Sequence, residues 1–199
     1  MTRPKTLLEM AGAPLTPSAL SSSAVLLIDC QMEYVDGALA LPGARPALAE
    51  AARLVERARK AGAPVIHVVH QGRAGGLFDL DAPRGKEAPE IAATPGEAVV
   101  KKPLPNSFAK TDLDEVLKKT GRTELIVAGF MTHMCVSSTV RAALDLGYRT
   151  TVVAGAAATR DLPAPDGGVL DAASLHRAAL VELADRFAIV VPDSSRLPD

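Results

Sequence analysis

Short runs of Val, Ile and Leu alternate along the chain with longer segments of helical periodicity, and this alternation constrains the fold most. The apolar runs cover residues 24–29, 64–69, 98–102, 124–129, 149–155 and 187–192, and helical patterns cover 45–62, 111–121, 135–147 and 170–186. Strands that are apolar throughout are typical of parallel sheets covered by helices. The pattern predicts an α/β fold: one three-layer αβα domain with an open, mostly parallel, six-stranded, Rossmann-like sheet.

Composition limits the classes of partner. The chain has 199 residues, 48% of them hydrophobic, which suits one domain with a sizeable core. Its 22 basic residues balance 23 acidic ones, so nothing favours binding to nucleic acid or a membrane. We expect a small-molecule substrate. Neither a signal peptide nor a membrane span is evident, which predicts a cytoplasmic protein. Residues 1–20 are predicted to be an N-terminal extension and residues 21–199 the domain.

Two irregular segments interrupt the pattern. Residues 71–96 are rich in Gly and Pro, and residues 161–168 form a second turn-rich stretch. Long connections in a compact domain usually belong to binding loops or lids. Both segments are candidates for the walls of a pocket, and the sequence does not say whether either one closes over it.

Polar residues follow three of the predicted strands at their carboxyl ends, where open parallel sheets bind their ligands. Asp29 ends the first strand, Lys101 and Lys102 end the third, and Cys135 follows the fourth. Because side chains alternate along a strand, Cys30 should point away from Asp29 and into the core. Only one of the two lysines can face the cleft, and the pattern does not decide which.

Cys135 is the candidate nucleophile, since it opens a predicted helix directly after a strand and a tight turn. Free amides and the helix dipole at such a position stabilise a thiolate, so the pKa of Cys135 should fall. The same amides can bind an oxyanion. The alternative is a cysteine that only fills the core. Two cysteines are too few for a disulfide framework or a structural zinc site.

Three motifs in order resemble those of the isochorismatase-like cysteine hydrolases, a superfamily that includes nicotinamidases and carbamoylsarcosine amidohydrolases. The segment LLIDCQMEY is similar to its Asp-x-Gln-x-x-aromatic motif, with Asp29, Gln31 and Tyr34 in the matching places. KPLPNSF resembles its lysine motif and selects Lys102, six residues before Phe108. GFMTHMCVSS is similar to its Gly-x-x-Thr-x-x-Cys-Val signature. The resemblance extends from about residue 24 to residue 192.

The resemblance implies roles for particular residues. Asp29, Lys102 and Cys135 are the expected catalytic residues. A non-proline cis peptide is expected between Phe130 and Met131, which would turn the amide of Met131 toward the substrate beside that of Cys135 as an oxyanion hole. Positions expected to contact substrate are Gln31, Tyr34, Phe108 and His133.

No metal and no cofactor are expected. In the superfamily that this chain resembles, nicotinamidases hold a metal with an Asp-x-His motif and further histidines. This chain has no histidine in residues 35–50, the segment that follows Tyr34, so the resemblance implies that this metal site is absent. His67 and His70 lie three residues apart on one strand, so alternation points them to opposite faces. His70, nearer the edge, is a candidate for contact with substrate, and His176 is expected to be structural.

Three functions stay open at this point. The favoured one is a metal-independent cysteine hydrolase that cleaves an amide, carbamoyl or ureido carbon–nitrogen bond through a thioester. An isochorismatase-type enol-ether hydrolase would use Asp29 as an acid and would not need Cys135. In a thiol sensor or binding module, Cys135 would be oxidised reversibly and no substrate would be turned over. The resemblance also implies a homo-oligomer, either a dimer or a tetramer.

Overall fold

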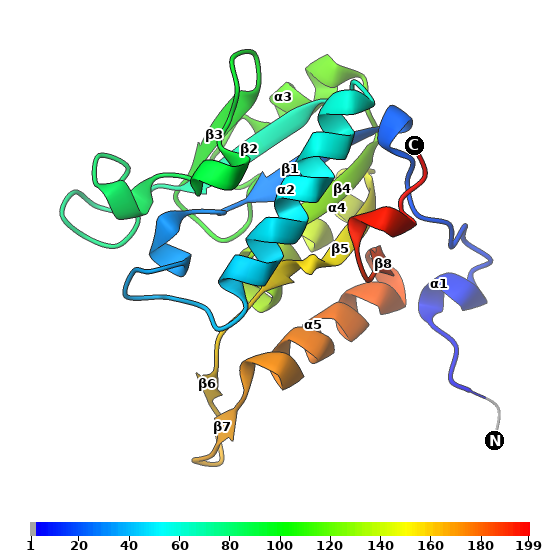
Figure 1. Ribbon diagram of the computed structural model, residues 1–199. Helices are drawn as coiled ribbons and strands as arrows, with labels where there is room; N and C mark the ends of the chain where they lie inside the picture. The colour runs from blue at the N-terminus through cyan, green and yellow to red at the C-terminus, as the bar shows by residue number, and fades with distance from the viewer. Residues whose placement is uncertain (1–2) are drawn as a thin grey trace.

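The computed structural model describes residues 3–199 and contains a six-stranded sheet between two layers of helices (Figure 1). All neighbouring strands in this sheet are parallel. The order is β3-β2-β1-β4-β5-β8, with β1 at Ser23–Ile28, β2 at Val65–His70, β3 at Ala98–Lys102, β4 at Glu124–Phe130, β5 at Arg149–Ala158 and β8 at Ile189–Val191. The predicted six strands are confirmed, and the sheet is wholly parallel.

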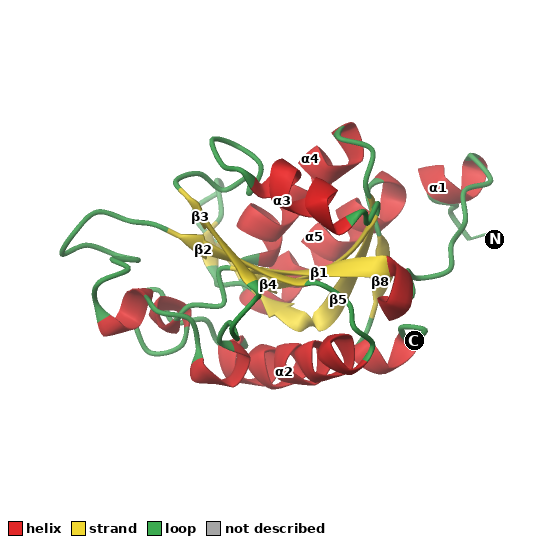
Figure 2. Cartoon of the chain, turned by 90° about the horizontal axis from the view of Figure 1, so that it is seen from above, coloured by secondary structure: helices red, strands yellow, loops and turns green. Residues whose placement is uncertain are grey.

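Helices cover both faces of the sheet, as the three-layer prediction requires. Figure 2 shows one long helix on one face and three helices on the other: α2 (Ala44–Lys60) against α3 (Leu113–Thr120), α4 (Ser137–Asp145) and α5 (Ala172–Arg186). Two separate clusters of buried apolar side chains fill the two interfaces. All six residues of β1 are buried, which explains why its sequence is apolar without alternation.

Successive strands are added to one side of β1 as far as β3, and β4 then begins the other side. The connection from β1 to β2 contains α2 on one face, whereas the connection from β3 to β4 contains α3 on the opposite face. β1 and β4 are neighbours, so their carboxyl ends form the switch point at which such sheets bind ligands. Asp29 follows β1 there, and the segment that contains Cys135 follows β4.

Close contact between β1 and β4 depends on Gly129. It pairs with Ile28 and has a φ of +120°, a value that L side chains rarely adopt. A Cβ atom at this position would lie 2.0 Å from the carbonyl oxygen of Ile28. Glycine is therefore required where the two strands that carry the switch point approach each other.

The two irregular segments lie at different places around the carboxyl edge. Residues 71–96 form a long loop with short 3₁₀ turns at Pro83–Gly85 and Pro89–Ile91. Residues 161–168 belong to a small hairpin, β6 (Leu162–Pro163) with β7 (Val169–Leu170), that projects away from the body of the molecule (Figure 1). Whether either segment acts as a lid stays open.

The N-terminal segment lies beside α5 and includes a short helix, α1 (Leu7–Met10). The amide of Leu7 donates to a carboxylate oxygen of Asp185, 2.8 Å away. The amide of Ser18 donates to the hydroxyl of Thr151, which ties the end of the segment to β5. The boundary at residue 20 stays a prediction. No helix within residues 3–199 is long and apolar enough to cross a membrane.

Candidate active site

Asp29 lies at the switch point directly after β1. Its side chain is fully buried and its backbone has a φ of +52°, a left-handed conformation that is uncommon outside glycine. This turn ends the strand. Cys30 is also buried, but it packs in the core cluster on the α2 side. The expected separation of Asp29 from Cys30 is present.

Lys102 is the lysine that reaches Asp29. Its side chain is fully buried, and its Nζ lies 2.8 Å from Oδ2 of Asp29 as an ion pair. The same Nζ donates to the carbonyl of Leu104 at 3.1 Å and to Sγ of Cys135 at 3.3 Å. Lys101 is exposed, as alternation along β3 requires. The choice of Lys102 over Lys101 as the inward residue is confirmed.

Cys135 lies in a single turn of π-helix, Thr132–Val136, that precedes α4. The α-helix begins at Ser137, two residues later than the sequence pattern predicted. Cys135 is 5% exposed, whereas Asp29 and Lys102 are fully buried. Cys135 is therefore the least buried of the three residues. Single π turns inside helices are frequent at functional sites.

The prediction of a lowered thiol pKa is wrong. Burial and the neighbouring charge of Asp29 raise the pKa of Cys135 to about 12, and the opposing charge of Lys102 compensates only in part. Burial also raises the pKa of Asp29, with Lys102 again acting in the opposite direction. Desolvation is the largest cause of the increase. Cys135 is a neutral thiol at neutral pH, so a base must remove its proton before it can attack.

The peptide bond between Phe130 and Met131 is cis, as the resemblance implied. Met131 immediately precedes the π turn, and its amide donates no hydrogen bond to another residue in 3–199. Cys135 lies within the same turn. These positions are compatible with an oxyanion hole formed by the amides of Met131 and Cys135, a role that stays a prediction.

Tyr34 forms part of the wall beside the Asp29–Lys102–Cys135 cluster. Its ring packs against those of Phe78 and Phe130, with centroids 5.0 and 5.7 Å apart. Burial raises the pKa of Tyr34, and the charges of Asp29 and Cys135 add to this increase. The position of Tyr34 suits contact with substrate. Phe78 comes from the 71–96 loop, and no periodic pattern pointed to it.

Gln31 anchors the same loop. Its amide nitrogen donates to the carbonyls of Gly85 and His70, at 2.7 and 3.0 Å, and its oxygen accepts from the amide of His70 at 2.8 Å. Both N–H donors are thereby used within the protein. The structure gives Gln31 a role in holding the loop to the end of β2, and its contact with substrate stays a prediction.

Phe108 and His133 occupy different surroundings. The ring of Phe108 stacks on Tyr148 with centroids 5.9 Å apart and packs with the α3–α4 core cluster. His133 lies in the π turn, and its Nδ1 is 2.5 Å from the hydroxyl of Thr159. His133 is half-buried beside Cys135 in sequence, which suits a place at the entrance. Neither assignment to substrate is tested by these contacts.

The remaining histidines are separated as alternation predicted. His67 is fully buried and contacts Glu87 and Glu97, at 2.6 and 3.2 Å. His70 is half-buried at the carboxyl edge, where its ring meets that of Phe78 at 5.2 Å. Burial and the charge of Lys102 lower its pKa. In the part of the chain that the structure describes, no group of three His, Cys, Asp or Glu side chains is placed to hold a metal ion.

The fold and this cluster define an α/β enzyme with a thiol, a carboxylate and an ammonium group at the switch point of its sheet. The chain belongs to the isochorismatase family: residues 23–193 match the family model described as "Isochorismatase domain". It is a hydrolase of that family, because its relatives are named hydrolases.

Individual relatives agree with this assignment. The chain is 37% identical over 183 residues to the secreted isochorismatase effector Isc1 of Verticillium dahliae, covering 92% of this chain and 94% of the relative. It is 38% identical over 177 residues to a streptothricin hydrolase of Streptomyces noursei, covering 88% of this chain and 64% of the relative. The crystal structure of an isochorismatase from Pseudomonas putida KT2440 superposes with a TM-score of 0.94 at 45% identity, covering 98% of this chain and all of the other.

Proposed function

We propose that the protein is a cysteine hydrolase that cleaves a carbon–nitrogen bond of a small amide, carbamoyl or ureido compound through a thioester on Cys135. The observation that carries this proposal is the contact of one ammonium group, Nζ of Lys102, with both Oδ2 of Asp29 (2.8 Å) and Sγ of Cys135 (3.3 Å). A nucleophile, a base and a cation at contact distance are the requirements of covalent acyl transfer.

The first half-reaction follows from the pKa values. The carboxylate of Asp29, made more basic by burial, takes the proton of the neutral Cys135 thiol while Lys102 balances the negative charge. The thiolate attacks the carbonyl carbon and forms a carbon–sulfur bond, and the amides of Met131 and Cys135 stabilise the resulting oxyanion. The carbon–nitrogen bond then breaks, and Asp29 returns its proton to the departing nitrogen.

The second half-reaction regenerates the thiol. Asp29 is again a carboxylate and takes a proton from a water molecule, whose oxygen attacks the thioester carbon. The carbon–sulfur bond breaks, the acid product leaves, and the proton on Asp29 returns to the sulfur. The proposed steps use protons and electron pairs of this chain's side chains, the substrate and one water molecule, and none is routed through a metal or cofactor.

A second candidate is hydrolysis of an enol ether with Asp29 as the acid. The direction of the Asp29 pKa shift supports it, because burial makes the protonated carboxyl easier to form, and this route starts from that acid rather than from the carboxylate that the thioester route needs. The thiol-sensor alternative gains no comparable support. Redox-sensing cysteines have low pKa values and are exposed, whereas Cys135 has neither property.

The test measures ammonia release from a panel of carboxamides and carbamoyl compounds by wild type and Cys135→Ala. We expect the variant to lose all turnover and the wild type, after treatment with a chelator, to keep it. Cys30→Ala is the matched control, because Cys30 packs in the other core cluster. Lys102→Ala should be inactive and Lys101→Ala active. Acid-quenched wild type should carry an acyl adduct on Cys135 by mass spectrometry.

Undiminished turnover in Cys135→Ala would eliminate the thioester mechanism. Turnover of enol ethers alone, unaffected by this substitution, would select the second candidate. We also propose that the enzyme works in the cytoplasm, as its sequence predicted, and as a dimer or tetramer, as the family resemblance implied. Fractionation of source cells and light scattering of the purified protein test these two statements.

A further inference from the structure

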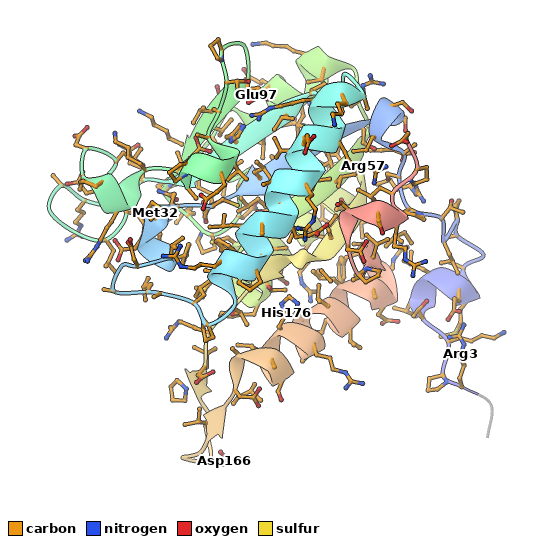
Figure 3. The ribbon with its side chains drawn as sticks, viewed as in Figure 1. Arg3, Met32, Arg57, Glu97, Asp166 and His176 are labelled. Carbon is orange, nitrogen blue, oxygen red and sulfur yellow. The ribbon has the colours of Figure 1, made fainter. Side chains whose placement is uncertain are left out.

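The π turn that carries the nucleophile is joined to α5 by a partly buried hydrogen bond between side chains. Thr132 is fully buried at the first position of the turn, and its hydroxyl oxygen lies 2.8 Å from Nδ1 of His176. Figure 3 shows His176 on the side of α5 that faces the sheet. This bond joins segments 44 residues apart in the sequence.

Thr132 occupies a place from which it controls the catalytic groups without touching them. It follows Met131 directly and precedes Cys135 by three residues, so it lies between the two amides of the proposed oxyanion hole. The hydrogen bond of its side chain joins this single turn to α5 and so restrains the position of the turn. A small displacement of these amides would change their distance to the oxyanion.

The direction of this bond depends on which ring nitrogen of His176 carries the proton. His176 is half-buried, and burial lowers its pKa, which favours the neutral ring. With its proton on Nε2 the ring accepts at Nδ1 from the hydroxyl of Thr132, and with its proton on Nδ1 it donates to the hydroxyl oxygen. The backbone carbonyl of Thr132 accepts from the amide of Ser137, the first residue of α4. Thr132 therefore connects the turn to both α4 and α5.

Few residues of α5 point inward. Ala179 and Leu183 are its buried residues. His176 precedes Ala179 by about one helical turn and Leu183 by about two, so the three residues lie on one stripe of the helix. His176 is the polar member of this stripe, at the end that contacts the segment Thr132–Val136.

From these contacts we infer that His176 is a positioning residue for the proposed cysteine hydrolase: through the hydroxyl of Thr132 it sets the positions of the Met131 and Cys135 amides and of the thiol. The inference rests on the proposed function. It extends the structural role expected for His176 from the sequence, because it assigns to this residue an effect on the chemical step rather than on folding alone.

The test is a double-mutant cycle with His176→Leu and Thr132→Val. Each substitution should lower kcat by about tenfold with little change in KM, since the groups that bind substrate are retained. The double variant should also lose about tenfold, not the roughly hundredfold expected of independent sites. His176→Asn should restore part of kcat, because its side-chain oxygen can accept near the position of Nδ1. Arg177→Ala, on the exposed side of α5, is the matched control.

Melting temperatures of all variants separate this effect from a loss of folding. Additive losses, an equal loss in His176→Asn and His176→Leu, or a change confined to KM would overturn the inference. Alkylation of Cys135 by iodoacetamide is a readout that needs no substrate, and the rate should fall in His176→Leu and recover in His176→Asn. If no compound of the panel is hydrolysed, the proposed function fails, while an unaltered alkylation rate in His176→Leu contradicts the positioning role itself.

Discussion

At the scale of single residues, the site contains one cation for two potential anions. Burial raises the pKa values of both Asp29 and Cys135, and the charge of Lys102 acts against both increases. The carboxyl and the thiol share one cation and therefore titrate as a coupled pair. A raised thiol pKa and a competent nucleophile are compatible here, because the base is in contact with the same ammonium group.

Replacement of Asp29 by Asn should abolish turnover and yet make the thiol of Cys135 easier to ionise. Turnover should be lost, because no base remains to take the thiol proton. The pKa of Cys135 should fall below about 12, because the charge of Asp29 is one of the causes that raise it and Lys102 still favours the thiolate. The pH dependence of alkylation by iodoacetamide, followed by mass spectrometry, measures the shift.

The Cys30→Ala background removes the second free thiol from this measurement. The sign follows from charge alone: loss of a neighbouring anion favours the thiolate, so alkylation should become fast at lower pH than in wild type. An unchanged or higher transition would show that Asp29 does not act on the sulfur, which would remove the basis for its role as the base.

At the scale of elements, the strands could be predicted because they are apolar throughout and end in polar residues. The pattern could not separate Lys101 from Lys102. In so short an edge strand, either lysine could belong to the set of side chains that points inward. It placed the helix start at Cys135 because no periodic signal distinguishes a π turn from a first α turn. Contacts of Gln31 with Gly85, or of Thr132 with His176, join distant segments and leave no local signal. For the same reason, the sequence does not show that Phe78 and His176 are neighbours of the site.

The approach of β1 to β4 makes a direct prediction for Gly129→Ala. The new Cβ would lie 2.0 Å from the carbonyl oxygen of Ile28, so the strands must separate. We expect the free energy of unfolding to fall by about 3 kcal/mol or more, as for overpacked cores. Urea denaturation followed by circular dichroism measures this change.

Gly121→Ala provides the comparison. Gly121 ends α3 with a φ of +68°, and a Cβ atom added there would meet no atom of a non-adjacent residue within 4 Å. This variant should lose only about 1 kcal/mol, the cost of a left-handed residue with a side chain. Equal losses in the two variants would mean that φ, rather than the contact between strands, requires glycine at position 129.

At the scale of the whole molecule, the site is formed by residues that follow central strands of the sheet together with one residue from an edge strand. Asp29 and Cys135 follow the central strands β1 and β4, whereas Lys102 ends β3, whose single neighbour among the described strands is β2. Val99 and Lys101 of β3 are exposed. Edge strands have fewer contacts and open locally at a lower free energy than central ones.

Activity should therefore disappear before the fold does. In increasing urea, turnover should fall at concentrations where far-ultraviolet circular dichroism is still native, because separation of β3 withdraws Lys102 from Asp29 and Cys135. Hydrogen exchange should likewise be faster in β3 than in β1. Coincident loss of turnover and ellipticity, with equal exchange in both strands, would show that β3 opens only with the whole sheet.

Because of this arrangement, a change at the outer border of β3 should affect activity although it lies away from the Asp29–Lys102–Cys135 cluster. The outer border of β3 has no paired strand within residues 3–199. A designed peptide that adds a further strand along this border would hold the ammonium group in register with its two partners. Such an augmented enzyme should tolerate more denaturant before turnover stops, although the added peptide would never meet the substrate.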